Sequence, residues 1–198
     1  GMSLLILLLF PHFSGTYMLY LASLAGVYSI VSIGLNLLFG FTGLISIGHA
    51  AFLGTGAYAT AILLTRASTI PFPVILILSG LLAGVLGLIV GLPALRLSGH
   101  YLAMATMGFG FVMEEIFLHW ESLTKGALGI TVPKVSIGPV HFVSGMSKYY
   151  LILILVFIMI LLARNILNSK TGRAFIAIRD HEIAAQTMGI NSAWYITI

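Results

Sequence analysis

The sequence predicts an all-α polytopic membrane protein, a bundle of helices that crosses a bilayer several times. Of its 198 residues, 60% are hydrophobic and 7% are charged, whereas soluble domains carry roughly 25% charged residues. Several apolar runs approach the ~20 residues that a membrane-spanning helix needs. We expect a single transmembrane domain over residues 1–198. Apolar runs that stop short at residues 4–10 and 193–198 indicate a fragment of a longer chain, incomplete at its C-terminus.

Composition also limits the chemistry. The sequence has no cysteine, so neither disulfides nor cysteine metal sites are available. The net charge of +4 is small and spread over the expected loops, which is typical of membrane edges and argues against nucleic-acid binding.

The first full span is expected at residues 16–39. A row of small residues along it would let a neighbouring helix approach closely. These residues are Ala22, Gly26, Ser29 and Ser32. Gly40 and Gly43 then interrupt the apolar run before it resumes at residues 44–65. Backbone leaves regular helix within a membrane only where protein or a water-filled cavity satisfies its polar groups, and transporters use such breaks near mid-membrane to build a substrate path.

His49 follows this glycine-rich break. Its imidazole is either held by backbone carbonyls of the broken helix or faces the path. Metal binding is not expected, because no second histidine or carboxylate stands nearby at ligand spacing.

The next span is expected at residues 74–95. Four glycines at spacings of four, three and four predict close helix packing without chemistry. They are Gly80, Gly84, Gly87 and Gly91. Residues 101–120 form another span and carry Glu114 and Glu115, the only acidic residues inside an apolar run. Adjacent helical residues do not face each other, so a position near the aqueous mouth, or pairing with a partner's basic group, is favoured over a proton relay.

After the longest loop, at residues 121–148, the last complete span is expected at residues 149–166. It leads into a polar stretch, residues 172–191, which must lie outside the hydrocarbon. Thr171 as N-cap and Gly189 as terminator predict one helix between them. Its face of small apolar residues suits docking to a partner, or packing on lipid or on the chain's own bundle.

Basic residues near span ends give the orientation. If the stretch after the last span is cytoplasmic, five basic residues lie inside: Arg96, Arg164, Lys170, Arg173 and Arg179. Four lie outside: Arg66, Lys125, Lys134 and Lys148. The dense cluster after residue 163 decides for the cytoplasm.

Residues 172–191 read GRAFIAIRDHEIAAQTMGIN, which resembles the cytoplasmic loop of permease subunits in ATP-binding-cassette (ABC) importers. The loop signature E-A-A-x-x-x-G is met by Glu182, Ala184, Ala185 and Gly189, with Ile183 inserted. The whole string is similar to branched-chain amino-acid permeases of the LivM type. So are residues 34–58, residues 91–106, and residues 122–129, where Lys125 replaces a glycine.

The resemblance implies a cytoplasmic coupling helix at residues 172–190 that fits a cleft in a separate ATPase subunit. The residues carried over for docking are Gly172, Arg173, Ala174, Ala177, Arg179, Glu182, Ala184, Ala185 and Gly189. It also implies that the broken segment lines the translocation path. The residues carried over for the path are Asn36, Gly43, Ser46, Gly48, His49 and Gly54. No family role is carried over to Glu114 or Glu115.

The resemblance further implies four partners: ABC ATPase subunits, a second permease subunit of LivH type, a periplasmic solute-binding protein and membrane lipid, in the bacterial plasma (inner) membrane. The sequence has no G-x-x-x-x-G-K-[ST] motif for ATP, and no catalytic constellation that would indicate an enzyme. No cofactor is expected. Two alternatives stay open: a urea or amide ABC permease of the same family, and an ion-coupled secondary transporter that would use Glu114 or Glu115.

Overall fold

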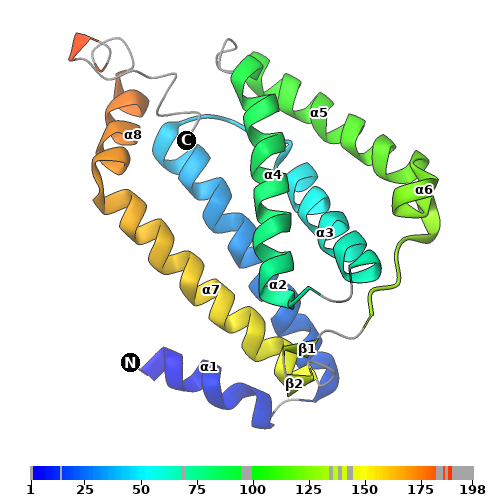
Figure 1. Ribbon diagram of the computed structural model, residues 1–198. Helices are drawn as coiled ribbons and strands as arrows, with labels where there is room; N and C mark the ends of the chain where they lie inside the picture. Colours follow the sequence, from blue (N-terminus) through cyan, green and yellow to red (C-terminus); the bar gives the residue numbers. More distant parts are fainter. Residues whose placement is uncertain are drawn as a thin grey trace.

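The computed structural model is helical apart from one very short hairpin, which confirms the predicted fold class (Figure 1). It describes residues 2–13, 15–67, 70–94, 100–133, 136–137, 140–141, 145–181, 185 and 187–188. The long helices are α2 (Thr16–Leu35), α3 (His49–Arg66), α4 (Phe72–Ala94), α5 (His100–His119) and α7 (Gly145–Asn168). The short elements are α1 (Met2–Phe13), the π-helix η1 (Asn36–Phe41), α6 (Glu121–Thr124), the 3-10 helix η2 (Gly126–Leu128), β1 (Ser136–Ile137), β2 (Val140–His141) and α8 (Lys170–Asp180).

Within these described residues, four segments are long and apolar enough to cross a membrane. They are Thr16–Phe41, Phe72–Pro93, His100–His119 and Gly145–Asn168. They correspond to four of the five predicted spans. The fifth, predicted at residues 44–65, corresponds to α3, which is not among the four. Together these segments make the chain an integral membrane protein.

The helices pack in two pairs, α2 parallel to α7 and α3 antiparallel to α4, and α5 lies against α3 (Figure 1). At one end of the bundle, α2 continues into η1 and the break, which leads to the start of α3. Helix α8, which follows α7, lies at the same end. The opposite end holds α1 and the β1–β2 hairpin, in which Ser136 is opposite His141.

Two of the small-residue rows predicted from sequence behave differently. In α2, Gly26 packs directly on α7, because a Cβ there would lie 2.6 Å from Cγ2 of Ile152. In α4, a Cβ at Gly80, Gly84 or Gly91 would meet no atom within 4 Å. Gly87, the fourth glycine of the row, packs on α3, because a Cβ there would lie 3.7 Å from Cε1 of Phe52. The prediction that this row packs a helix is therefore met at Gly87 and not at the other three positions within the described part of the chain. Instead Ile75 and Ser79 form the buried side of α4.

The N-terminal helix α1 contains Pro11, where the sequence suggested a stop. Proline has no N–H to offer the carbonyl four residues earlier, which is that of Leu7. The hydroxyl of Tyr149 donates to Leu7 O at 3.0 Å, and that of Tyr150 donates to Leu8 O at 3.0 Å. Hydroxyls from α7 thus replace a backbone donor that α1 lacks.

Candidate functional site

The break between α2 and α3 is an ordered segment. The chain widens into the π-helix η1, and residues 43–48 then leave helical geometry. Gly43 has φ +72°, a left-handed conformation that favours glycine. Its N–H donates to Phe39 O at 3.2 Å, and the N–H of Leu44 donates to Leu38 O at 3.4 Å. The side chain of Thr42 also donates to Leu38 O. Short π-helices are frequent at functional sites.

Thr106 of α5 supports the far side of the break. Its hydroxyl accepts the N–H of Ile47 at 3.0 Å and donates to Ala103 O at 3.0 Å. Thr106 is 9% exposed and its bond to the Ile47 N–H is part-buried, so Thr106 gives this N–H a partner within the protein. Sequence reasoning assigned Thr106 no role. The available signal was a hydroxyl inside an apolar run, at a position matching the family pattern.

The same crossing explains Gly48. A Cβ at Gly48 would run into the backbone carbonyl of Thr106, and Gly48 Cα lies 3.8 Å from where a Cβ of Gly110 would be. The start of α3 therefore touches the backbone of α5 directly. Glycine is needed there for close approach of two helices.

The six predicted path residues do not all share one cavity. Gly43, Ser46, Gly48 and His49 lie in or beside the break. The half-buried His49 ring packs on Gly34, where a Cβ would be 3.1 Å from Nε2, and edge-on to Phe52 at 6.3 Å between ring centroids. Gly54 lies further along α3, against the ring of Phe117.

Asn36 faces a different space. It lines an open groove of about 420 Å³ between η1 and the end of α7. Arg164 and Asn168 of α7 line the same groove. Thus Asn36 is the path residue that borders an open, partly polar surface next to the last turns of α7.

The break follows a helix of membrane-spanning length. The 20 residues of α2 measure about 30 Å, which equals the hydrocarbon thickness. The break lies at the end of the bundle that also carries α8.

Helix α8 begins at Lys170, and its N-cap is Ser169 instead of the predicted Thr171. The Ser169 hydroxyl accepts N–H groups from Thr171 at 3.1 Å and Gly172 at 3.5 Å. The helix ends at Asp180, and His181 is extended, with φ −154° and ψ 92°. Residues 172–190 therefore do not form one continuous helix.

The small apolar face of α8 packs on the chain's own bundle. Ala174, Phe175 and Ile178 are buried, as is Ala185 beyond the helix, and α8 contacts α7 and η1. Of the alternatives left open from sequence, this face follows the one in which the helix packs on its own bundle. The outer face carries Arg173 and Ile176.

The predicted docking residues fall into three groups. Gly172, Ala174 and Ala185 are buried, and Ala177 is half-buried. A Cβ at Gly172 would collide with the Leu167 backbone, so this glycine is required by the turn from α7. Arg173 and Arg179 are exposed. The remaining three, Glu182, Ala184 and Gly189, lie outside the described residues.

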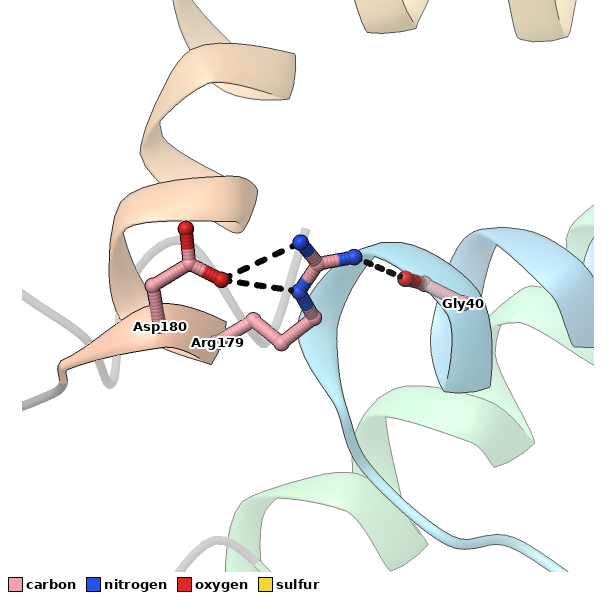
Figure 2. Close-up of polar contacts among 3 residues, drawn as sticks. All are labelled: Gly40, Arg179 and Asp180. Atoms are coloured by element: carbon pink, nitrogen blue, oxygen red, sulfur yellow. Dashed lines mark hydrogen bonds and ion pairs between the residues drawn. The ribbon is translucent and has the colours of Figure 1, made fainter.

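Arg179 points inward to the break. Figure 2 shows its guanidinium between Asp180 and the Gly40 carbonyl. Nη1 donates to Gly40 O at 2.8 Å, while Nε and Nη2 both donate to Asp180 Oδ1 at 3.1 Å. One side chain thus joins α8 to η1.

Glu114 and Glu115 lie away from this end, near the C-terminus of α5. Glu115 pairs with His119 of its own helix at 2.9 Å, and both side chains are exposed. Glu114 is also exposed. An exposed pair one helical turn apart fits a position near water.

The family assignment follows from a comparison with known protein families. The family described as "Branched-chain amino acid transport system / permease component" matches residues 17–198. The chain belongs to this family. The match includes the break and all of α8, so the geometry described above lies within the permease component.

Curated relatives agree with this family. The high-affinity branched-chain amino acid transport system permease protein LivM of Escherichia coli (strain K12) is 30% identical over an alignment of 195 residues, which covers 86% of this chain and 46% of the relative. LivM of Salmonella typhimurium (strain LT2) gives the same identity and coverage. A probable LivM of Methanocaldococcus jannaschii is 26% identical over 200 residues, covering 83% of this chain and 57% of the relative.

The chain spans about half the length of the curated relatives it matches. No solved structure matches it at a significant level.

Proposed function

We propose that this chain is part of the permease subunit of an ABC importer for branched-chain amino acids, and that separate ATPase subunits power it. The observation that carries the proposal is the permease-family match across residues 17–198, with LivM proteins among the relatives. An ordered helix break beside a polar helix at one end of the bundle supports it, since a motor acting on that helix would be close to the path.

The proposal includes the partners and the location. The relatives' names describe a transport system, which supports further subunits: ABC ATPases, a LivH-type second permease and a periplasmic solute-binding protein. We place the protein in the bacterial plasma membrane with α8 in the cytoplasm. The exposed apolar side chains of α4, such as Ile77, Leu81 and Ile89, suit lipid or the second permease.

The docking surface in this proposal is the outer face of α8 and the chain beyond it. Since Ala174 and Ala185 are buried on the chain's own helices, an ATPase would contact the exposed Arg173 and Ile176 and the segment up to residue 190. Met188, which is 86% exposed, belongs to that surface.

Transport is tested with the full-length protein, co-expressed with its ATPase and second permease subunits and reconstituted with its solute-binding protein in liposomes. The expected result is ATP-dependent uptake of leucine, isoleucine or valine. Uptake of urea in place of these would favour the amide-permease alternative. Uptake without ATP that a protonophore abolishes would indicate an ion-coupled transporter and refute the proposal.

Docking is tested by a crossed pair of variants. Ile176→Glu, on the outer face of α8, is expected to reduce ATPase co-purification at least tenfold and to leave receptor binding unchanged. Leu128→Glu changes a side chain that is 94% exposed in η2, on the side expected to face the periplasm. It should weaken receptor-stimulated uptake and leave ATPase co-purification intact. The reverse pattern would mean that the orientation is wrong.

A further inference from the structure

We propose that Arg179 is the positioning residue that makes α8 and the helix break move as one body, so that motion imposed on α8 reaches the translocation path. This inference rests on the proposed function. It also reassigns a residue of the docking motif, from contact with the ATPase to contact within the permease.

The first observation is the acceptor that Arg179 uses. Gly40 lies at the end of the α2–η1 helix, where the last carbonyls have no intrahelical partner. The N–H groups of Gly43 and Leu44 bond to Phe39 O and Leu38 O, and the Arg179 guanidinium takes the Gly40 carbonyl at 2.8 Å. A side chain of α8 therefore supplies the cap of the helix that precedes the break.

The second observation is the orientation of the guanidinium. Asp180 Oδ1 accepts both Nε and Nη2 at 3.1 Å, which leaves Nη1 directed at Gly40 (Figure 2). The planar fork of arginine can serve two acceptors at fixed geometry, whereas a lysine ammonium on a flexible stem holds no such orientation. The contact therefore fixes the orientation of α8 relative to Gly40, in addition to holding the two together.

The third observation is the packing of the arginine stem on the break. A Cβ at Gly43 would lie 3.1 Å from Cγ and 3.8 Å from Cβ of Arg179. The same side chain thus touches the break at two points, Gly40 and Gly43. A Cβ at Gly40 would in turn meet the Asn36 amide oxygen, so Asn36, which lines the groove, lies directly over Gly40.

The rest of α8 packs on α7 and η1, and its Ala174, Phe175 and Ile178 are buried. Since the break itself has few backbone bonds of its own, its position follows its neighbours. The Arg179–Asp180 pair is exposed, at 42% and 58% for the two side chains, and exposed pairs add little to stability. A purely structural role would therefore predict almost no effect of removing it, whereas a coupling role predicts a loss of transport.

The first test measures solute taken up per ATP hydrolysed, in liposomes with the full-length complex. Arg179→Ala is expected to keep ATPase co-purification within twofold of wild type and to lower uptake per ATP at least tenfold. Arg179→Lys should restore only part of it. Lys170→Ala, another basic residue of α8, is the matched control and should stay within twofold. The proposal is overturned if Arg179→Ala keeps normal uptake per ATP, or if it loses ATPase co-purification.

The second test replaces the contact by a covalent bond. The 3.8 Å between the Arg179 Cβ and the position of a Gly43 Cβ is about the mean Cβ separation in disulfides. The given sequence has no cysteine, so Gly43→Cys with Arg179→Cys can be made in a full-length background cleared of other cysteines.

Under reducing conditions the double variant should show the same low uptake per ATP as Arg179→Cys alone. Oxidation should restore uptake per ATP to at least half that of Gly43→Cys alone, which is the baseline for any strain at this left-handed position. An oxidised form no more active than the reduced form overturns the proposal.

The proposed function and the role of Arg179 are tested separately. If the wild-type complex shows no ATP-driven uptake, the proposed function fails and the inference fails with it. If the wild type transports and Arg179→Ala transports equally well per ATP, only the inference fails.

Discussion

Two connecting segments of this chain are held in different ways. The turn that follows α5 is held mainly by its own residue Thr124, whose hydroxyl lies 2.7 Å from Phe117 O and 2.8 Å from Trp120 O and accepts the Gly126 N–H at 3.2 Å. One bond reaches it from outside, from Arg66 Nη2 to Ser122 O at 3.2 Å. The break between α2 and α3 is held from outside, by Thr106 of α5 and Arg179 of α8.

The difference teaches which segment can carry motion. A turn held mostly by partners within ten residues keeps most of its hydrogen bonds when its surroundings move. A break whose partners belong to other helices changes shape when those helices move, because its hydrogen bonds are tertiary. We therefore expect changes at Thr124 to affect stability alone, and changes at the break to affect stability and transport together.

The largest effect is expected at Gly48. In Gly48→Ala the new Cβ meets the Thr106 carbonyl, and a backbone group cannot rotate away as a side chain can. We expect a loss of about 3 kcal/mol, at the upper end for overpacking, and loss of uptake. Denaturant titration in detergent and liposome uptake measure the two. Gly56→Ala on the same helix is the control, since a Cβ there meets nothing within 4 Å. If the two variants lowered stability and uptake equally, the close contact of Gly48 with the α5 backbone would be refuted.

The next effect is expected at Thr106. Thr106→Val removes the acceptor of the Ile47 N–H in a part-buried bond, and leaving that N–H unsatisfied should cost about 2 kcal/mol. Uptake per ATP should fall with stability, because the break is no longer anchored to α5. Thr106→Ser keeps the hydroxyl and should recover most of both. A valine variant with wild-type stability would show that the hydroxyl does not anchor the break.

A smaller effect is expected at Thr124, and it is of a different kind. Thr124→Val should lower the unfolding free energy by about 1.5 kcal/mol, since Thr124 is 3% exposed and bonds three backbone groups. Uptake per ATP should stay within twofold of wild type. A selective loss of transport at Thr124 would break the contrast between the two segments.

The smallest effect, and a favourable one, is expected at Lys125. This residue has φ 60°, in the left-handed region, which costs a side chain with a Cβ roughly 1 kcal/mol. Lys125→Gly should therefore raise the unfolding free energy by about that amount in the same titration. Lys125→Ala keeps the strain and should not. If the alanine and glycine variants were equally stable, the gain would come from removing charge.

The sequence predicted where the break lies but not which residues hold it. The glycine-rich interruption predicted a break, and Gly43 is left-handed there. The family pattern has glycine where this chain has Lys125, and the structure gives Lys125 a glycine-like φ. The partner of each residue was beyond reach, because Thr106 lies 59 residues from Ile47 and Arg179 lies 139 residues from Gly40.

The same limit applies to the apolar face of α8 and to the glycine row of α4. An amphipathic pattern tells which face of α8 is apolar, but it is equally consistent with a partner protein, with lipid or with the chain's own helices. Gly80 and Gly84 have the same spacing as packed glycines, yet no neighbour reaches them among the described residues. Helix periodicity is a local property, and the identity of the surface opposite a helix is not.

By itself, the sequence determined the membrane class, the positions of the apolar helices and the location of the break. Hydrophobicity and glycine content are local properties, so they determine structure where those residues stand in the chain. Only the tertiary structure decided that the break lies beside α8, that Ser169 and not Thr171 caps that helix, and that Arg179 donates to the Gly40 carbonyl. These depend on which backbone groups are left without a partner once the helices have packed, and that is set by residues far apart in the chain.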